Sequence, residues 1–431
     1  MKASVSAVIL LRLFLFMNQQ ELIPHLFRTE FRKITAVLCK LFGPALSGIE
    51  IAEDIASETF LSALETWTYK GIPENPTAWL YSVAKNKAIN YIKRNHLFAG
   101  KISSQIKYDA SEISEIEIDL SEKNITDSQL QMLFAICHPS ISTESQIGIS
   151  LRILCGFGID EIANALLTNK ETVNKRLFRA KEKLRIENVK IVPIDIGITS
   201  EAEINKRLET VLTTLYLLFN EGYYSESKDS VLREDLCLEA MRLTYLLIEN
   251  EQTNQPSVNA LLSLMCFQSS RFEARKNKNG EMVLYDDQDE TLWNDELISK
   301  GVYFLHQASQ GNTLSKYHLE ASIAYWHTIK ADTKEKWENI LQLFNQLLQI
   351  DYSPIAALNR TYALSKANGK GEAIIEAEKL KLTNNHFYFT LLGELYSDID
   401  NNKAKENFQK ALSLAKTQTD KQTIQKKIGS F

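Results

Sequence analysis

The stretch NPTAWLYSVAKNKAINYIKR, residues 75–94, decides the first part of the fold. Pro76 stands where a first helical residue would stand, so we expect a helix over residues 76–94, after a loop at 71–75. This helix is basic and aromatic, and no acidic residue lies between Ala78 and Asn95. The basic residues are Lys85, Lys87, Lys93 and Arg94, and the aromatic residues are Trp79, Tyr81 and Tyr91.

This mixture of charge and rings allows two interpretations. Basic groups interleaved with aromatic rings suit a surface that neutralises phosphates and stacks the bases of single-stranded nucleic acid. The same pattern also suits an ordinary amphipathic helix with a solvated lysine face. The stretch alone leaves both open.

Two further helices are expected before this one. Apolar residues recur at helical spacing over residues 21–41, and Gly43 with Pro44 ends that run. A second pattern covers residues 51–68. It places Ile55, Phe60, Leu61 and Leu64 inward and Glu53, Asp54 and Glu58 on another side.

Residues 150–185 predict a helix-turn-helix. A helix ends at Gly156-Phe157-Gly158, residues 159–167 form a short helix, and a turn at 168–170 leads into a basic helix over 171–185. Two helices joined by a short turn, the second one basic, match the motif that places a recognition helix in the major groove. A plain helical hairpin remains the alternative. The two glycines lack the third that a dinucleotide-binding loop needs, because Glu161 stands there.

Two quoted motifs carry a family resemblance. AEDIASETFLSALETW at 52–67, followed by residues 75–94, resembles region 2 of the sigma-70 family, and GIDEIANALLTNKETVNKRLFRAKEKLR at 158–185 resembles its region 4. Their order, with a short connector and no region 3, is similar to the extracytoplasmic-function (ECF) group. The resemblance covers about 170 residues. It implies an alternative sigma factor whose partners are promoter DNA and the clamp of the largest subunit and the flap of core RNA polymerase.

The resemblance also implies site residues. Polymerase binding would use Asp54, Glu58 and Leu61. The minus-10 element would meet Trp79, Lys85, Asn86, Asn90, Tyr91 and Arg94, with a flipped base held by the loop Gly71, Ile72, Pro73, Glu74 and Asn75. The minus-35 element would meet Thr172, Asn174, Lys175, Arg176, Phe178, Arg179 and Lys181.

Charge is distributed in blocks along the chain, although the net charge is only −5. Residues 17–104, expected to form region 2, and 129–188, expected to form region 4, are mildly basic. The linker between them, residues 105–128, carries seven acidic and two basic residues. This linker is either a disordered polyanion near the RNA exit channel or a solvated tether. The C-terminal half is acidic, so any polyanion-binding surface is confined to the first half.

The last 240 or so residues resemble the helical, tetratricopeptide-like (TPR-like) extension of a subgroup of these factors. We expect a helical domain over 200–330 and degenerate repeats over 331–431, with a protein partner possible on the repeats. The repeat residues are Asn359, Tyr362, Ala363 and Ala373 in one copy, and Gly393, Tyr396, Ala404, Phe408 and Ala411 in the next. We expect Tyr223, Tyr224, Trp293 and Trp326 to fill the core, and residues 286–290 to form a solvated loop, because they lack the glycine and closing glutamate of a calcium loop.

The sequence therefore predicts an all-α protein whose extension regulates it in cis. Five scattered cysteines and seven scattered histidines give no disulfide framework, zinc motif or cofactor motif, and no enzyme motif is found. We expect a cytoplasmic protein that does not span a membrane, with Met17 as the natural start and residues 1–16 dispensable. A helix-turn-helix regulator that binds duplex DNA without polymerase, and a repeat scaffold, remain the alternatives.

Overall fold

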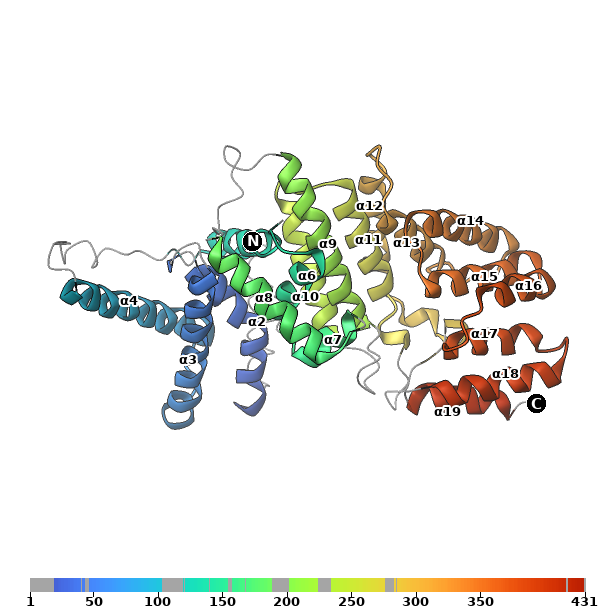
Figure 1. Cartoon of the computed structure of the whole chain (residues 1–431), viewed down its shortest axis with the longest axis horizontal. Helices are drawn as coiled ribbons and strands as arrows, with labels where there is room; N and C mark the ends of the chain where they lie inside the picture. The colour runs from blue at the N-terminus through green and yellow to red at the C-terminus, as the bar shows by residue number, and fades with distance from the viewer. Residues whose placement is uncertain are drawn as a thin grey trace. The chain divides into compact units, whose positions relative to one another are not determined.

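The structure is a computed structural model whose described regular elements are all helices, which confirms the all-α prediction (Figure 1). It describes residues 19–39, 41–42, 46–102, 119, 121–138, 140–153, 157–166, 168–187, 201–223, 234–275, 283, 285–415 and 418–429. The chain divides into two compact units, Met1–Val211 and Leu212–Phe431. The expectations for residues 1–16, for Tyr224 and for most of the linker lie outside the described residues.

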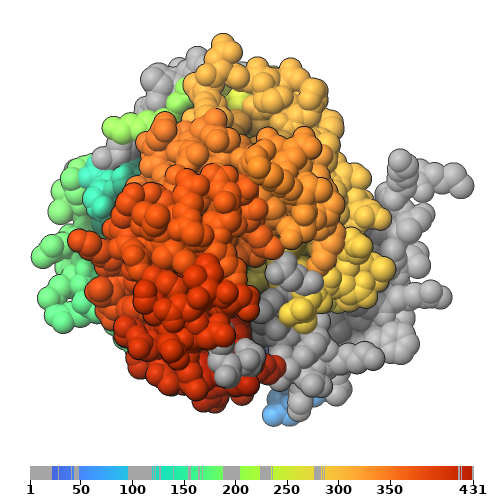
Figure 2. Space-filling model, turned by 90° about the vertical axis from the view of Figure 1, so that its right-hand side faces the viewer, coloured from blue at the N-terminus to red at the C-terminus, as the bar shows by residue number. Residues whose placement is uncertain are grey.

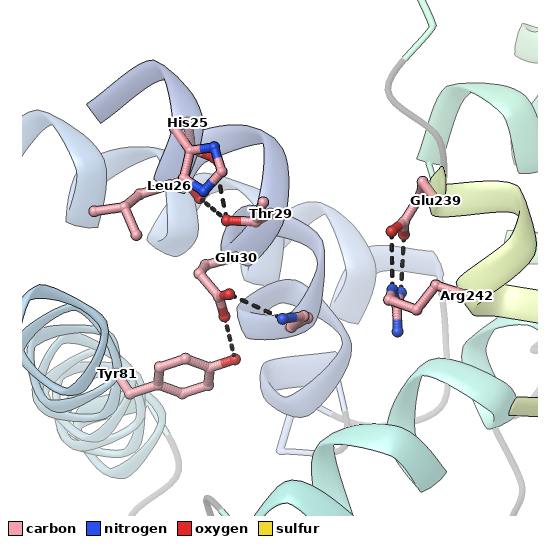
Figure 3. Close-up of polar contacts among 8 residues, drawn as sticks. His25, Leu26, Thr29, Glu30, Tyr81, Glu239 and Arg242 are labelled. Atoms are coloured by element: carbon pink, nitrogen blue, oxygen red, sulfur yellow. Dashed lines mark hydrogen bonds and ion pairs between the residues drawn. The ribbon is translucent and has the colours of Figure 1, made fainter. Parts of the chain in front are cut away.

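The first unit begins with three helices at the predicted places. They are α2 (Gln19–Cys39), α3 (Leu46–Lys70) and α4 (Pro76–Ile102), so α4 continues beyond the predicted end at residue 94. Phe27 and Phe31 of α2 pack on Phe60 of α3, with ring centroids 5.1 and 6.1 Å from it. Glu30 of α2 accepts a hydrogen bond from Tyr81 Oη of α4 at 3.1 Å (Figure 3).

One prediction about α3 is wrong. Leu61 and Leu64 were expected to point inward, yet they are 58% and 48% exposed. The core-facing positions of α3 are taken by Ala56, Phe60, Ala63 and Trp67, which recur every three or four residues, and all are buried. Leu61 and Leu64 fall outside this stripe.

Four shorter helices follow in the first unit. They are α5 (Glu122–Ile136), α6 (Thr143–Ile153), α7 (Ile159–Ala165) and α8 (Lys170–Ile186). The end of the predicted linker is helical, because the Ser121 side chain accepts a hydrogen bond from Asn124 N and caps α5. Helices α7 and α8 reproduce the predicted short helix, turn and basic helix.

Helix α9 (Glu201–Tyr223) leads into the second unit, where α10 (Glu234–Glu249), α12 (Asp295–Ala308) and α13 (Lys316–Trp326) pack around α11 (Pro256–Ser269). Almost every residue of α11 is buried. Helix α12 crosses α11 at Gly301, where a Cβ atom would lie 2.6 Å from the Phe267 ring. Only glycine permits this close approach.

The predicted solvated loop at 286–290 is in part structured. It lies among three short 3₁₀ helices, Glu273–Arg275, Tyr285–Asp287 and Glu290–Leu292. Gln288 is buried, whereas Asp287, Asp289 and Glu290 are exposed. Asp289 caps the third of these helices by accepting from Thr291 N, and hydrogen bonds from the Thr291 hydroxyl and N–H lower the pKa of its carboxyl group.

The C-terminal part of the second unit is a run of helices, each packed on the next. They are α14 (Lys334–Ile350), α15 (Pro354–Asn368), α16 (Lys370–Leu380), α17 (His386–Tyr396), α18 (Asn401–Leu414) and α19 (Gln418–Ile428). The residues of the two predicted repeat copies fall on the helix pairs α15–α16 and α17–α18. Figure 2 shows the orange-to-red surface of this run of helices as a continuous block. Most of the predicted repeat residues, including Ala363, Ala373, Ala404 and Ala411, are buried between the helices, whereas Asn359 is exposed.

The described cysteines are buried. They are Cys39, Cys137, Cys237 and Cys266. Burial raises the pKa of the Cys137 and Cys266 thiols to about 12, so these groups stay protonated and unreactive at neutral pH. In the described ranges, no helix is both long and apolar enough to cross a membrane.

Candidate nucleic-acid interface

Helix α4 presents a polar face. Asn86, Asn90 and Arg94 follow one another at four-residue intervals, so they lie on one side of the helix, and all three are exposed. Lys85 lies beside them and is half-buried. This face offers amide and cationic groups, which can donate hydrogen bonds to base edges and to phosphates.

The two predicted stacking residues of α4 are already partly engaged. Trp79 is half-buried, and its ring meets the Trp67 ring edge to face, with centroids 5.3 Å apart. Tyr91 packs in the same way on Phe42 at 5.5 Å, and the guanidinium of Arg94 lies 5.7 Å from its ring centroid. Each ring anchors α4 on one side, and only its remaining surface is available to a base.

The loop before α4 has a fixed shape. Gly71 has φ +81°, a left-handed conformation that favours glycine, and its N–H closes the end of α3 by donating to Trp67 O at 3.1 Å. Asn75 caps α4, because its side chain accepts from Ala78 N at 3.0 Å. Gly71 and Glu74 are exposed and Ile72 and Pro73 half-buried, which leaves a short open segment between two helix ends.

A second exposed face lies on α3. Asp54, Glu58 and Leu61 are spaced by four and three residues and are all exposed. Glu58 forms an exposed ion pair with Lys87 of α4 at 3.4 Å. Tyr69, at the end of α3, is 89% exposed, and sequence reasoning missed it. Acidic groups beside exposed apolar side chains suit a basic protein partner with an apolar centre.

Helix α8 separates its core face from its exposed face. Val173, Leu177, Ala180 and Leu184 are buried at helical spacing, and Asn169 caps the helix by accepting from Thr172 N at 2.8 Å. The predicted minus-35 residues lie away from this stripe. Asn174, Lys175, Phe178 and Arg179 are exposed, and Thr172, Arg176 and Lys181 are half-buried. Lys175 pairs with Glu171 one turn earlier at 2.7 Å.

Helix α8 also makes ionic contacts with α3, which sequence reasoning missed. Glu50 lies 3.8 Å from Lys181 Nζ and 3.2 Å from Arg185 Nη2. Glu53, one turn further along α3, is half-buried. Burial raises the pKa of its carboxyl group, and the positive charges of Lys181, Arg32 and Arg152 oppose that rise. We call Glu50, Glu53, Lys181 and Arg185 the α3–α8 clasp.

Two further contacts join α2 to α5 and α6, the helices that precede the helix-turn-helix. Cys39 of α2 and Met132 of α5, both buried, have their sulfur atoms 4.0 Å apart. Arg32 of α2 also donates a hydrogen bond to Ile153 O of α6. The region 2-like helices and the helix-turn-helix are therefore packed together, with part of the basic surface of α8 turned toward acidic side chains.

Two family models match the chain. Residues 26–97 match "Sigma-70 region 2", and residues 207–309 match "Family of unknown function (DUF6596)". The first match covers most of α2, all of α3, the loop at 71–75 and most of α4. The second covers most of α9 and all of α10, α11 and α12.

Two curated proteins are similar to this chain. "Uncharacterized protein R00370" of Rhizobium meliloti (strain 1021) is 31% identical over 373 residues, which are 85% of this chain and 86% of that protein. "ECF RNA polymerase sigma factor SigX" of Bacillus subtilis (strain 168) is 22% identical over 134 residues, which are 31% of this chain and 68% of that protein. No solved structure matches.

These matches agree with the geometry of α3 and α4 and point to a non-catalytic role. Among the described residues, no group of three or more histidine, cysteine or acidic side chains could hold a metal ion. The region 2 match lies on the helices that carry the exposed Asn86, Asn90 and Arg94. The chain belongs to one family with the Rhizobium meliloti protein, and its residues 26–97 form a sigma-70 region 2 domain.

Proposed function

We propose that this chain is an ECF-type sigma factor that recruits core RNA polymerase to promoters. The exposed face of Asp54, Glu58 and Leu61 on α3 would bind the polymerase clamp. Helix α4 with the loop at 71–75 would bind the minus-10 element, and α8 would bind the minus-35 element. The observation that carries this proposal is the region 2 match over 26–97, which falls on the helices with those exposed faces.

The two DNA-binding faces would make different kinds of contact with the promoter. A flipped minus-10 base needs polar groups to replace its lost pairing and stacking, which cost a few kcal/mol. The loop at 71–75 and Asn86 would supply such groups. In the duplex, Lys175 and Arg176 would contact base edges in the major groove, while Arg179 and Lys181 would contact phosphates. The second unit would regulate these steps in cis, and its helix pairs offer a surface to a protein partner.

Binding to core polymerase tests this proposal directly. The full chain, mixed with purified bacterial core enzyme, is expected to co-elute with it in gel filtration at low micromolar concentration. A chain that binds duplex DNA while never co-eluting with the core enzyme would be a helix-turn-helix regulator instead.

Substitutions in α8 test the minus-35 contacts. Lys175→Ala or Arg176→Ala is expected to weaken binding of the polymerase complex to a matched promoter by about 1–3 kcal/mol each, the cost of losing a base contact. The measurement is a titration with matched and scrambled minus-35 duplexes. Lys183→Ala, on an exposed residue of the same helix, is the control. Equal losses on both duplexes would assign these residues to phosphates instead.

The α3–α8 clasp must open during this function. The minus-10 and minus-35 positions are about 25 base pairs apart, or about 85 Å at about 3.4 Å per base pair. Helices in ionic contact at 3.2 Å cannot span that distance. Glu50 would therefore occupy Lys181 and Arg185 until DNA phosphates and polymerase replace it.

Glu50→Lys is expected to open the clasp, because it turns two attractions into repulsions. Exposed ion pairs contribute about 0.2–1 kcal/mol each, so the loss of two of them should lower the ratio of closed to open molecules by roughly twofold to thirtyfold. Dyes placed at Ser57→Cys and Lys183→Cys would report this as lower energy transfer. Glu65→Lys, exposed on the same helix, should leave the transfer unchanged, and an equal drop in both variants would contradict the assignment.

A further inference from the structure

The last two helices form a basic end to an otherwise acidic half of the chain. Residues 401–431, which contain α18 and α19, carry seven lysines and two acidic residues, whereas residues 186–400 carry 20 basic and 32 acidic residues. The average charge of this half hides the basic block. The prediction that only the first half binds polyanions, which is made from that average, therefore leaves the block out.

Five lysines of α18 and α19 reach the surface. Lys403, Lys405, Lys410 and Lys426 are exposed, and Lys421 is half-buried. Lys403 and Lys410 are seven residues apart, so they lie on the same side of α18, two turns from each other. We call these five residues the α18–α19 lysine surface.

No carboxylate neutralises this surface. Among the described residues, Lys405, Lys421 and Lys426 form no ion pair. The ammonium groups of the other two lysines lie 5.0 and 5.9 Å from the centroids of aromatic rings on α17, and a ring attracts a cation without removing its charge. Glu406 is the one exposed acidic side chain described on these two helices. The α18–α19 lysine surface therefore attracts negative charge.

The other exposed side chains of these helices favour a nucleic acid over a protein partner. None of the described large hydrophobic side chains that are exposed belongs to α18 or α19. Protein interfaces have an apolar centre and few lysines, whereas protein–DNA interfaces are polar and positively charged. A single strand would need exposed rings on which its bases stack, so a duplex backbone fits better. The exposed neighbours include six amides, which are Asn401, Asn402, Gln409, Gln418, Gln422 and Gln425.

We infer that the α18–α19 lysine surface binds the phosphate backbone of duplex DNA without reading its sequence. The ammonium groups and the neighbouring amides both donate hydrogen bonds to phosphate oxygens, and the ammonium groups also release counterions from the duplex. The choice of DNA among duplexes rests on the proposed function, in which the first unit binds promoter DNA. The surface would then add affinity that is the same for every sequence.

The salt dependence of DNA binding tests this inference. The full chain is titrated with a random-sequence duplex of about 30 base pairs, without polymerase, at roughly 50 to 200 mM KCl. The combined variant Lys405→Gln, Lys421→Gln and Lys426→Gln is expected to weaken binding about tenfold or more at the lowest salt concentration. It should also lower the slope of log K against log salt by about 2–3, because each lost phosphate contact removes about 0.9 from that slope.

Three other exposed lysines of the second unit provide a control with the same change of charge. Each of them is paired with a glutamate of its own helix, at 2.6 to 3.5 Å, and they are Lys300, Lys334 and Lys379. Replacing all three with glutamine should leave the slope unchanged, because these side chains lie outside the proposed surface.

Cross-linking locates the bound DNA. A benzophenone label on Gln425→Cys, at an exposed position of α19, is expected to cross-link to the duplex, whereas the same label on Ser299→Cys, at an exposed position of α12, is not. The chain without an added cysteine, treated with the same reagent, corrects for labelling of its own cysteines.

The inference is wrong if the substitutions in the α18–α19 lysine surface lower the slope no more than the control substitutions do. It is also wrong if Gln425→Cys cross-links no better than Ser299→Cys. Displacement of the duplex by polyglutamate at a lower concentration than by unlabelled DNA would assign the surface to an acidic protein instead. The assays contain no polymerase, so their failure is distinct from a failure of the chain to bind the core enzyme.

Discussion

Replacing Phe408 with alanine is expected to lower the free energy of unfolding of the C-terminal helix pairs by about 3–5 kcal/mol. Phe408 is 1% exposed, and its ring packs on α17 where a Cβ atom at Gly393 would lie 2.7 Å from it. Alanine would leave a cavity between α17 and α18, because the backbone at Gly393 carries no side chain to fill it. The Phe408 ring thus fills the space that the missing side chain of Gly393 leaves open.

Urea unfolding followed by circular dichroism measures this effect. Ile375→Ala is the matched control, since Ile375 is 58% exposed on α16 and its loss should change stability by less than about 0.5 kcal/mol. A loss below about 1 kcal/mol for Phe408→Ala would show that the helix pairs do not depend on this contact. The same variant in a transcription assay would report whether the extension acts on the first unit.

Glu320 is expected to make the second unit less stable as the pH rises from about 4.5 to about 7. Burial raises the pKa of its carboxyl group to about 7, although a hydrogen bond from Tyr216 at 3.2 Å and the charge of Lys316 oppose the rise. In this pH window the folded state holds a proton that the unfolded state has released. The free energy of unfolding therefore falls by up to about 3 kcal/mol across the window and is level above it.

Glu320→Gln removes this titration. It keeps an oxygen that accepts from Tyr216 and is expected to raise the thermal midpoint at pH 8 while leaving it nearly unchanged at pH 5. Glu406→Gln, on an exposed residue of α18, serves as the control. A wild-type midpoint that does not fall between pH 5 and pH 7, relative to Glu320→Gln, would show that Glu320 is ionised throughout.

Local patterns in the sequence predicted the helices that carry the proposed site. Pro76 and Asn169 mark the starts of α4 and α8, because proline suits a first helical position and an asparagine side chain caps a helix. The α8 residues expected at the minus-35 element lie outside its buried stripe. Their contacts with DNA stay predictions.

What the sequence did not predict depends on contacts between distant segments. Leu61 and Leu64 are as apolar as Phe60, and only the way α3 packs on its neighbours decides which of them is buried. Glu50 is 135 residues from its partner Arg185, so no local pattern pairs them. The only available signal was general, namely acidic residues in the helix pattern at 51–68 and basic residues in the helix at 171–185.

Run-off transcription tests the central claim most directly. The full chain, purified bacterial core polymerase and the DNA upstream of its own gene are combined, and the transcript is measured with and without the protein. The account predicts a discrete transcript that requires both the chain and the core enzyme and that weakens with Arg176→Ala. A chain that neither binds the core enzyme nor supports initiation would contradict the account.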